Sequence, residues 1–253
     1  MSSVLTDFTD GVAVITINRP EARNAVNNEV AELLAEAMQE LDAREDILVG
    51  ILTGAEGTFC AGMDLKAFVR GEHPWIPGRG FGGFAERPPA KPLIAAVEGW
   101  ALAGGCELAL AADMIVAARD AAFGLPEVKR GLVAAAGGLL RLPRVLPYQL
   151  AMEIVLIGDP ISAERAHAHG LVNALTEPGM ALVGARELAT RIAANGPLAV
   201  RASKQLMALS FGYNDADAHM LQQRITAPVF ASADAEDGAR AFAEKRVPAW
   251  KGE

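Results

Sequence analysis

The stretch Gly99–Gly131, GWALAGGCELALAADMIVAARDAAFGLPEVKRG, decides how the rest of the chain is interpreted. It places two carboxylates, Glu107 and Glu127, among side chains that are otherwise almost all apolar. Charged side chains seldom enter an apolar interior unless they are paired or used chemically. For Glu107 a purely structural alternative stays open, because the helix dipole favours a glutamate in the first turn of a helix.

Around this stretch the hydrophobic pattern predicts an α/β core. Five apolar or β-branched runs predict strands, at 12–18, 47–53, 92–97, 114–117 and 170–175. Apolar residues at i, i+3 and i+4 across 27–43 predict an amphipathic helix. Since the order strand, turn, helix recurs, we expect repeated ββα or βα units whose helices cover a sheet.

The last part of the chain has a different pattern. It is predicted to be helical from Ala181 to the end, with breaks at Gly196-Pro197 and Pro228. A helical module of this size cannot bury its own apolar stripes, which indicates packing on another subunit. We therefore divide the chain into an α/β core that holds the active site, 1–195, and an α-helical oligomerisation region, 196–253.

Composition and charge narrow the classes of function. A chain of 253 residues with 51% hydrophobic and 21% charged residues is globular, and its net charge of −8 disfavours nucleic-acid binding. The two cysteines and four histidines have no metal-ligand spacing, so no metal site is expected. Neither a secretory signal nor a membrane-spanning run is recognisable, so the expected location is the cytoplasm.

Two glycine-bearing loops suggest a particular chemistry. One covers 61–64, and the other leads into a predicted helix over 104–112. The first amides of a helix are unpaired and stabilise a developing negative charge. If the loops meet, one donor from each would bind a single carbonyl oxygen, while the two glutamates act as base and acid. These parts suit reactions through a thioester enolate, and no P-loop, nucleophile elbow or dinucleotide motif offers another chemistry.

Segments matching a known family run through nearly the whole chain. They are NRPEARNA at 18–25, FCAGMDL at 59–65, PLIAAVEGWALAGGCEL at 92–108, FGLPE at 123–127, GDPISAERA at 158–166, GLV at 170–172 and FAEKR at 242–246. In this order they resemble the crotonase, or enoyl-CoA hydratase/isomerase, superfamily. The resemblance implies a spiral of repeated ββα units and a helical C-terminal part that builds trimers, commonly paired as a dimer of trimers.

The resemblance also implies roles for four residues. The N–H groups of Met63 and Gly104 resemble the family's oxyanion hole for the thioester carbonyl. Glu107 and Glu127 match its two hydratase glutamates, of which the first activates water at Cβ and the second protonates Cα. The implied reaction adds water to a 2-trans-enoyl-CoA and gives a 3-hydroxyacyl-CoA. No separate cofactor is expected, because coenzyme A is part of the substrate.

Further matches imply contacts with the acyl-CoA. They are Arg23, Ala25, Ala61, Asp64, Leu65, Lys66, Trp100, Pro126 and Ala135. Ala135 stands where the family commonly has a glycine whose N–H helps to hold the water, and alanine retains that N–H. Lys245 resembles a residue that reaches the CoA phosphates from a neighbouring subunit, although a solvated surface lysine is the alternative. The expected partners are thus an acyl-CoA thioester and further copies of the chain, with neither nucleic acid nor membrane.

Several functions stay open within this resemblance. The presence of both glutamates favours a hydratase over a Δ3,Δ2-enoyl-CoA isomerase, which typically needs one carboxylate. The text of 123–143, FGLPE followed by GG-x-LRLP, resembles a carnitinyl-CoA dehydratase branch. A non-catalytic acyl-CoA-binding protein is the alternative from another class. The Gly- and Pro-rich stretch 70–92 is predicted to be a long loop that shapes the acyl pocket or, alternatively, a surface loop without a role.

Overall fold

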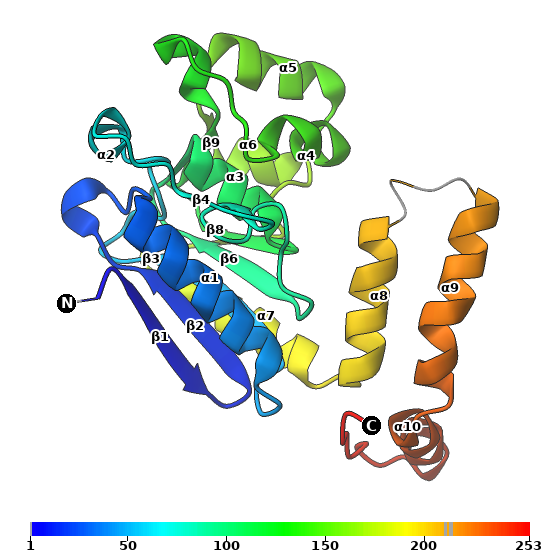
Figure 1. Cartoon of the computed structure of the whole chain (residues 1–253). Helices are drawn as coiled ribbons and strands as arrows, with labels where there is room; N and C mark the ends of the chain where they lie inside the picture. The colour runs from blue at the N-terminus through cyan, green and yellow to red at the C-terminus, as the bar shows by residue number, and fades with distance from the viewer. Residues whose placement is uncertain (1, 210–211, 213–214) are drawn as a thin grey trace.

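A six-stranded sheet forms the centre of the computed structural model, which describes residues 2–209, 212 and 215–253 (Figure 1). Its strand order is β1-β2-β3-β6-β8-β11, and all neighbours are parallel except the β1–β2 hairpin. Asp10 and Gly11, both with positive φ, make the two-residue turn that this hairpin needs. The six strands are β1 Val4–Thr9, β2 Val12–Ile17, β3 Val49–Gly54, β6 Leu93–Val97, β8 Met114–Ala118 and β11 Ala174–Thr176.

A smaller sheet lies beside the first and has the order β10-β9-β7. Its strands are β7 Trp100–Leu102, β9 Ala122–Gly124 and β10 Ile161–Ser162. Successive repeats place one strand in each sheet and then a helix: β6 and β7 precede α3 (Gly104–Ala111), and β8 and β9 precede the 3-10 helix η2 (Pro126–Arg130). After β3 the second strand is reduced to one bridge, between Cys60 and Ala101. The expected α/β class with repeated ββα units is confirmed.

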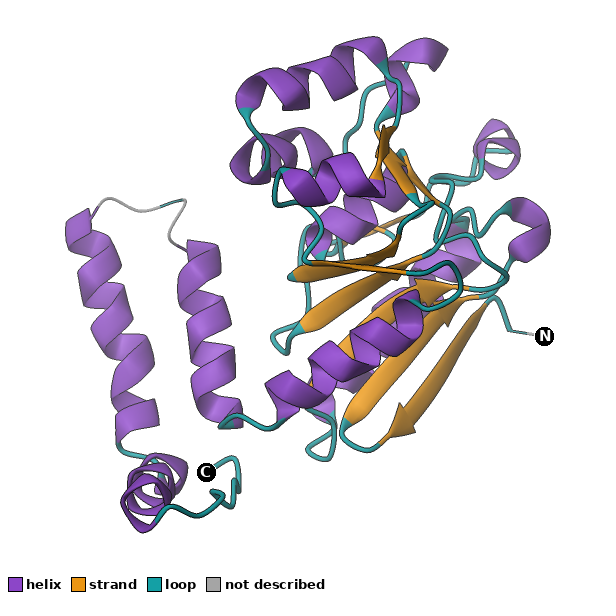
Figure 2. Cartoon of the chain, turned by 180° about the vertical axis from the view of Figure 1, so that it is seen from behind, coloured by secondary structure: helices purple, strands orange, loops and turns teal. Residues whose placement is uncertain are grey.

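Helices cover both faces of the large sheet (Figures 1 and 2). Alternate residues of β2, such as Ile15 and Val14, belong to the apolar cores on opposite faces. This double burial explains why the parallel strands are continuous apolar runs in the sequence. Helix α1 (Asn28–Ala43) covers one face, and its first turn is capped by Asn27, whose Oδ1 accepts from the Val30 N–H. Helix α7 (Ala181–Ala193) covers the other face.

Three predicted elements differ from the structure. The strand predicted at 170–175 is only β11, because Leu171 turns back and its N–H donates to the Ala166 carbonyl at the end of α6. The predicted loop 70–92 contains a short hairpin, β4 Trp75–Ile76 and β5 Gly80–Phe81. Pro228 does not break its helix, which continues to Phe230.

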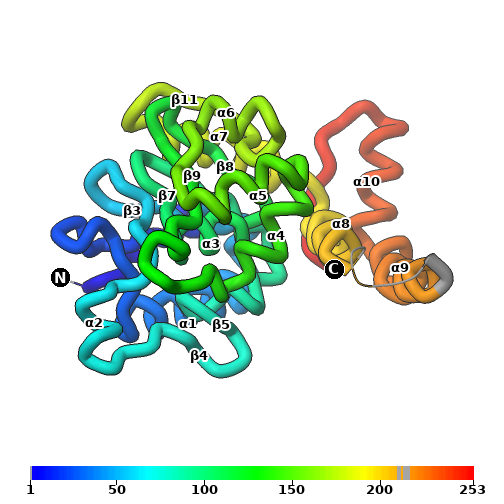
Figure 3. Tube along the Cα trace, turned by 90° about the horizontal axis from the view of Figure 1, so that it is seen from above, coloured from blue at the N-terminus to red at the C-terminus, as the bar shows by residue number. Residues whose placement is uncertain are grey.

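Three helices project from one side of the core, in agreement with the expected helical C-terminal part (Figures 1 and 3). They are α8 Pro197–Leu209, α9 Asp215–Phe230 and α10 Ala233–Glu244. The Lys204 ammonium joins α8 to the core, since it lies 2.6 Å from the Asp113 carboxylate and 2.9 Å from the Lys91 carbonyl. The remaining helices are η1 Pro20–Ala22, α2 Leu65–Val69, α4 Gly138–Val145, α5 Tyr148–Ile157 and α6 Ala163–Ala168. Within the described residues, no helix is long and apolar enough to cross a membrane.

Candidate active site

The two glycine-bearing loops meet at the start of α3. The bridge between Cys60 and Ala101 brings the first loop beside β7. Gly62 then lies so close to α3 that a Cβ on it would be 3.0 Å from the backbone nitrogen of Gly104 and 2.8 Å from the Ala103 Cβ. Only glycine allows this approach, and Gly62 has a φ of +99° that also favours glycine. The backbone of Met63 therefore lies beside the first turn of α3.

Two backbone N–H groups at this junction remain available. Neither the Met63 N–H nor the Gly104 N–H donates a hydrogen bond to another described residue. The Gly104 N–H belongs to the first turn of α3, where amides have no partner within the helix. Ala103 before it has φ 51° and ψ −129°, a strained conformation for a residue with a side chain. Its own N–H donates to the Gly124 carbonyl at 2.9 Å, which holds this strained peptide in place.

Glu107 is buried one turn into α3, with only 3% of its surface exposed. Its Oε1 accepts hydrogen bonds from the backbone N–H groups of Ala136 and Gly138, each at 2.8 Å. The carboxyl is therefore bound to the 136–138 turn and does not cap its own helix. Burial is the main cause that raises the pKa of Glu107 to about 7, and the charge of Glu127 raises it further while the two N–H donors oppose the change.

Glu127 lies in η2, directly after β9. Because β7 and β9 run parallel, with Leu102 opposite Gly124, α3 and η2 leave the small sheet at the same edge. The Oε2 of Glu127 is buried without a hydrogen-bond partner among the described residues. Burial raises the pKa of this carboxyl. Glu107 thus lies one turn from the Gly104 N–H, and Glu127 is close enough for its charge to raise the pKa of Glu107. Two interacting carboxyls with raised pKa values are a common property of catalytic sites.

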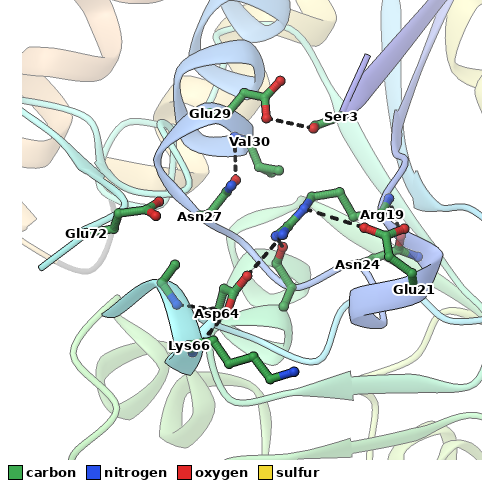
Figure 4. Close-up of polar contacts among 12 residues, drawn as sticks. Ser3, Arg19, Glu21, Asn24, Asn27, Glu29, Val30, Asp64, Lys66 and Glu72 are labelled. Atoms are coloured by element: carbon green, nitrogen blue, oxygen red, sulfur yellow. Dashed lines mark hydrogen bonds and ion pairs between the residues drawn. The ribbon is translucent and has the colours of Figure 1, made fainter. Parts of the chain in front are cut away.

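A second part of the site is built from the segments 23–26 and 61–66, which run side by side. The Ala61 N–H donates to the Arg23 carbonyl, and the Asp64 N–H donates to the Val26 carbonyl. Figure 4 shows the Arg19 guanidinium between these segments: it lies 3.0 Å from Asp64 Oδ2 and donates to the Ala25 carbonyl at 2.7 Å. This pair fixes the two segments relative to each other.

Asp64 has a second structural task at the start of α2. Its Oδ1 accepts from the N–H groups of Lys66 and Ala67 and so caps the helix. Burial opposes ionisation of this carboxyl, but the hydrogen bonds from Ala67 and Arg19 outweigh burial and lower the pKa of Asp64. The Lys66 side chain extends away from this network (Figure 4).

Comparison with known proteins shows which family has this fold. The family model described as enoyl-CoA hydratase/isomerase matches residues 7–253.

The chain belongs to the enoyl-CoA hydratase/isomerase family. It is 42% identical over 242 residues to enoyl-CoA hydratase EchA19 of Mycobacterium tuberculosis, with 93% of this chain and 91% of the relative covered. It is also 42% identical over 249 residues to carnitinyl-CoA dehydratase of Salmonella typhi, with 94% of each chain covered. The solved structure of enoyl-CoA hydratase EchA1 from Mycobacterium marinum is 61% identical, with complete coverage of both chains and a TM-score of 0.98. These likenesses confirm the family and its crotonase fold.

Four other residues predicted from the family lie on β7, on η2, beside the 136–138 turn and at the end of α10. Trp100 is half-exposed on β7, and Pro126 opens η2 directly before Glu127. Ala135 is exposed and adjoins the turn that binds Glu107, although the donors to that carboxyl are the N–H groups of Ala136 and Gly138. Lys245 is exposed at the end of α10, far from α2 and α3 of the same chain (Figures 1 and 3).

Three contributors to this family site were not predicted from the sequence: the N–H of Ala136, the N–H of Gly138 and the side chain of Arg19. Gly138 carried a signal, since it follows another glycine. A Cβ there would lie 2.8 Å from Glu107 Cγ and 3.0 Å from its Oε1. Among the described residues, no group of three or more His, Cys, Asp or Glu side chains is placed to hold a metal ion.

Proposed function

We propose that the protein is an enoyl-CoA hydratase, which adds water reversibly to a 2-trans-enoyl-CoA and gives a 3-hydroxyacyl-CoA. The observation that carries the proposal is a pair of interacting carboxyls, buried Glu107 and half-buried Glu127 with its buried Oε2, at the start of α3, where the N–H groups of Met63 and Gly104 are available. An isomerase needs a single proton carrier, whereas hydration needs one group for water and one for Cα. The name of the relative EchA19 supports the same reaction.

In the proposed mechanism the thioester oxygen accepts hydrogen bonds from the N–H groups of Met63 and Gly104. These donors stabilise the enolate that forms when water attacks Cβ. Ionised Glu107 takes a proton from the water as its oxygen bonds to Cβ. Protonated Glu127, whose pKa burial also raises, donates its proton to Cα. Both glutamates then return to their starting protonation states by exchange with solvent, and dehydration follows the same steps in reverse.

Binding of the coenzyme A part is assigned to the paired segments 23–26 and 61–66. Their exposed members are Arg23 and, at the start of α2, Leu65 and Lys66. We further propose a homotrimer or a dimer of trimers, in which Lys245 of a neighbouring copy reaches the CoA phosphates. Within one chain α10, which Lys245 follows, lies on the opposite side of the molecule from α2 (Figure 1). Coenzyme A enters as part of the substrate, and no separate cofactor is proposed.

The test is hydration of crotonyl-CoA and longer enoyl-CoAs, followed by the loss of the conjugated enoyl absorbance. Glu107→Gln and Glu127→Gln should each lower kcat roughly 10²- to 10⁴-fold. KM should change little, because both glutamates act mainly on the transition state. Unchanged activity in Glu127→Gln would refute the proposed acid. Tight binding of CoA esters without turnover on a broad thioester panel would instead support a non-catalytic acyl-CoA-binding protein.

A second candidate is dehydration of carnitinyl-CoA. It is favoured by the 42% identity to carnitinyl-CoA dehydratase of Salmonella typhi over 94% of each chain. Both reactions use the same enolate and the same two carboxyls, so they differ in the acyl group that the site accepts. Comparing kcat/KM for carnitinyl-CoA and for crotonyl-CoA separates them, and a clear preference for carnitinyl-CoA would replace the first proposal.

A further inference from the structure

Arg141 is a half-buried residue in the first turn of α4, directly after the turn that binds Glu107. Its guanidinium joins two separate segments. Nη1 donates to the Ala136 carbonyl at 3.3 Å, and Nη2 donates to the Ala85 carbonyl at 2.5 Å. Only a forked side chain reaches both oxygens in this way, because a lysine presents its donors from a single nitrogen.

Both backbone polar groups of Ala136 are therefore hydrogen-bonded to side chains of the site. Its carbonyl accepts from Arg141, while its N–H donates to Glu107 Oε1. Gly137 allows the guanidinium to pack closely, since a Cβ there would lie 2.2 Å from Arg141 Nη1. The φ of Gly137, +95°, also favours glycine. The 136–138 turn is thus clamped between a guanidinium on one side and the Glu107 carboxyl on the other.

The charged groups around this turn have opposing effects on the ionisation of the Glu107 carboxyl. Arg141 on α4 favours the ionised carboxylate, and Glu127 on η2 disfavours it. Within α3 the buried thiol of Cys106 adjoins Glu107. Arg141 itself faces Glu107 and Arg144, and it forms no ion pair within 4.0 Å with any described carboxylate. Its charge therefore acts on Glu107 across the turn and not through direct contact.

We propose that Arg141 is a positioning residue of the site, which fixes the 136–138 turn so that two N–H groups hold Glu107 Oε1 and the other carboxyl oxygen faces the reacting water. This inference rests on the proposed hydratase function. Arg141 does not touch the substrate in this role. It acts through the turn and through its charge.

The first experiment compares Arg141→Met with Arg186→Met. Arg186 is the matched control, because it is also half-buried but lies on α7 and pairs with Asp7 at 3.2 Å. For crotonyl-CoA hydration, Arg141→Met should lower kcat on the order of 10²-fold, as expected for a displaced catalytic group. KM should change far less, and the acidic limb of the kcat–pH profile should move to higher pH. Arg186→Met should leave all three unchanged.

Chemical rescue separates positioning from general damage to the fold. In Arg141→Ala, free guanidinium ion at concentrations well below those that denature proteins should restore part of the lost kcat. Circular dichroism and gel filtration establish that each variant is folded. An undiminished kcat in Arg141→Met, or a lower kcat with an unshifted pH profile and no rescue, would overturn the proposal.

A readout without turnover distinguishes failure of this proposal from failure of the proposed function. Carbon-13 NMR of glutamate-labelled protein, with the Glu107 signal assigned through Glu107→Gln, follows the titration of that carboxyl directly. Arg141→Met should raise its midpoint even if the enzyme hydrates no enoyl-CoA. An unchanged midpoint would refute the role of Arg141, whereas a raised midpoint without any hydratase activity would refute only the proposed reaction.

Discussion

Burial of Glu107 couples the chemistry of the site to the stability of the fold. The pKa of this carboxyl is raised from 4.5 to about 7, mainly by burial. Between these values the folded protein holds a proton that the unfolded chain releases, so the free energy of unfolding falls as pH rises. The contribution of protonated Glu107 is complete below about pH 4.5, and it is lost as pH rises through the folded pKa of about 7.

Glu107→Gln should remove this fall in the free energy of unfolding at high pH. The amide oxygen still accepts from the N–H groups of Ala136 and Gly138, but no buried charge forms. At pH 8 the variant should therefore unfold with a free energy up to about 3 kcal/mol above that of the wild type. At pH 4.5 the two should be nearly equal. Urea unfolding at a series of pH values measures the difference, and parallel curves for the two proteins would contradict the prediction.

Residues such as Glu107 and Glu127 were recognisable from the sequence because a charge in an apolar run is a local anomaly. Their partners were not. The hydrogen bonds to Glu107 come from residues 29 and 31 positions away. Gly138 was marked only by the glycine before it, and no local pattern indicates that the Ala136 N–H will donate. The fork of Arg141 joins segments 5 and 56 positions away from it. Such contacts follow from the path of the chain in space, which local patterns do not contain.

The start of α3 depends on two adjacent glycines for different reasons. A Cβ on Gly105 would lie 2.1 Å from the Cys60 carbonyl oxygen, which is part of the backbone. A Cβ on Gly104 would lie 2.5 Å from the ring of Phe81, which is a side chain. The first contact fixes where the helix approaches the 60–63 loop. The second places an aromatic ring from β5 against the N–H donor of the site.

This difference predicts which variant can be rescued. Gly104→Ala and Gly105→Ala should each lower the free energy of unfolding by about 1–3 kcal/mol, as overpacking does, and both should lose activity. Adding Phe81→Leu should restore much of the loss in Gly104→Ala by making room for the new methyl group. It should restore none in Gly105→Ala, whose clash is with backbone. The four variants are compared by thermal unfolding and kcat, and equal rescue of both would disprove the assignment.

At the level of elements, the hydrophobic pattern predicted the strands that are buried on both faces of the sheet. It missed the strand at one edge of the sheet. The apolar runs of β3 and β6 were predicted because both faces are covered. β1 was missed, since most of its residues are exposed and its pairing comes from the hairpin with β2. The break predicted at Pro228 was wrong, because α9 ends only two residues later and loses a single hydrogen bond there.

For the whole molecule, the fold class could be predicted from the repeated order of strand, turn and helix. That repeat does not predict how the chain would assemble with further copies of itself. The sequence indicated helices with more apolar surface than they can bury, and in the structure Phe230 is 82% exposed and Phe242 is 88% exposed. A groove of about 1470 Å³ is lined by residues of α8, α9 and the core, among them Leu110, Met114 and Leu198. Exposed apolar surface of this kind indicates an interface.

The mass in solution tests this arrangement. Light scattering should give three or six times the chain mass of 26.5 kDa. Phe230→Asp and Phe242→Asp should lower that mass, because each would bury a charge in the interface. Val69→Asp is the control, since Val69 is equally exposed but lies on α2, away from the C-terminal helices (Figure 1).

If Lys245 of a neighbour binds the CoA phosphates, the dissociated Phe242→Asp variant should also show a raised KM for crotonyl-CoA. Its kcat should change less, because both glutamates, Met63 and Gly104 lie within one chain. Lys245→Met should raise KM in the same way without changing the mass, which separates the loss of one contact from the loss of assembly. A wild-type protein that stays at 26.5 kDa would remove the basis for this role of Lys245.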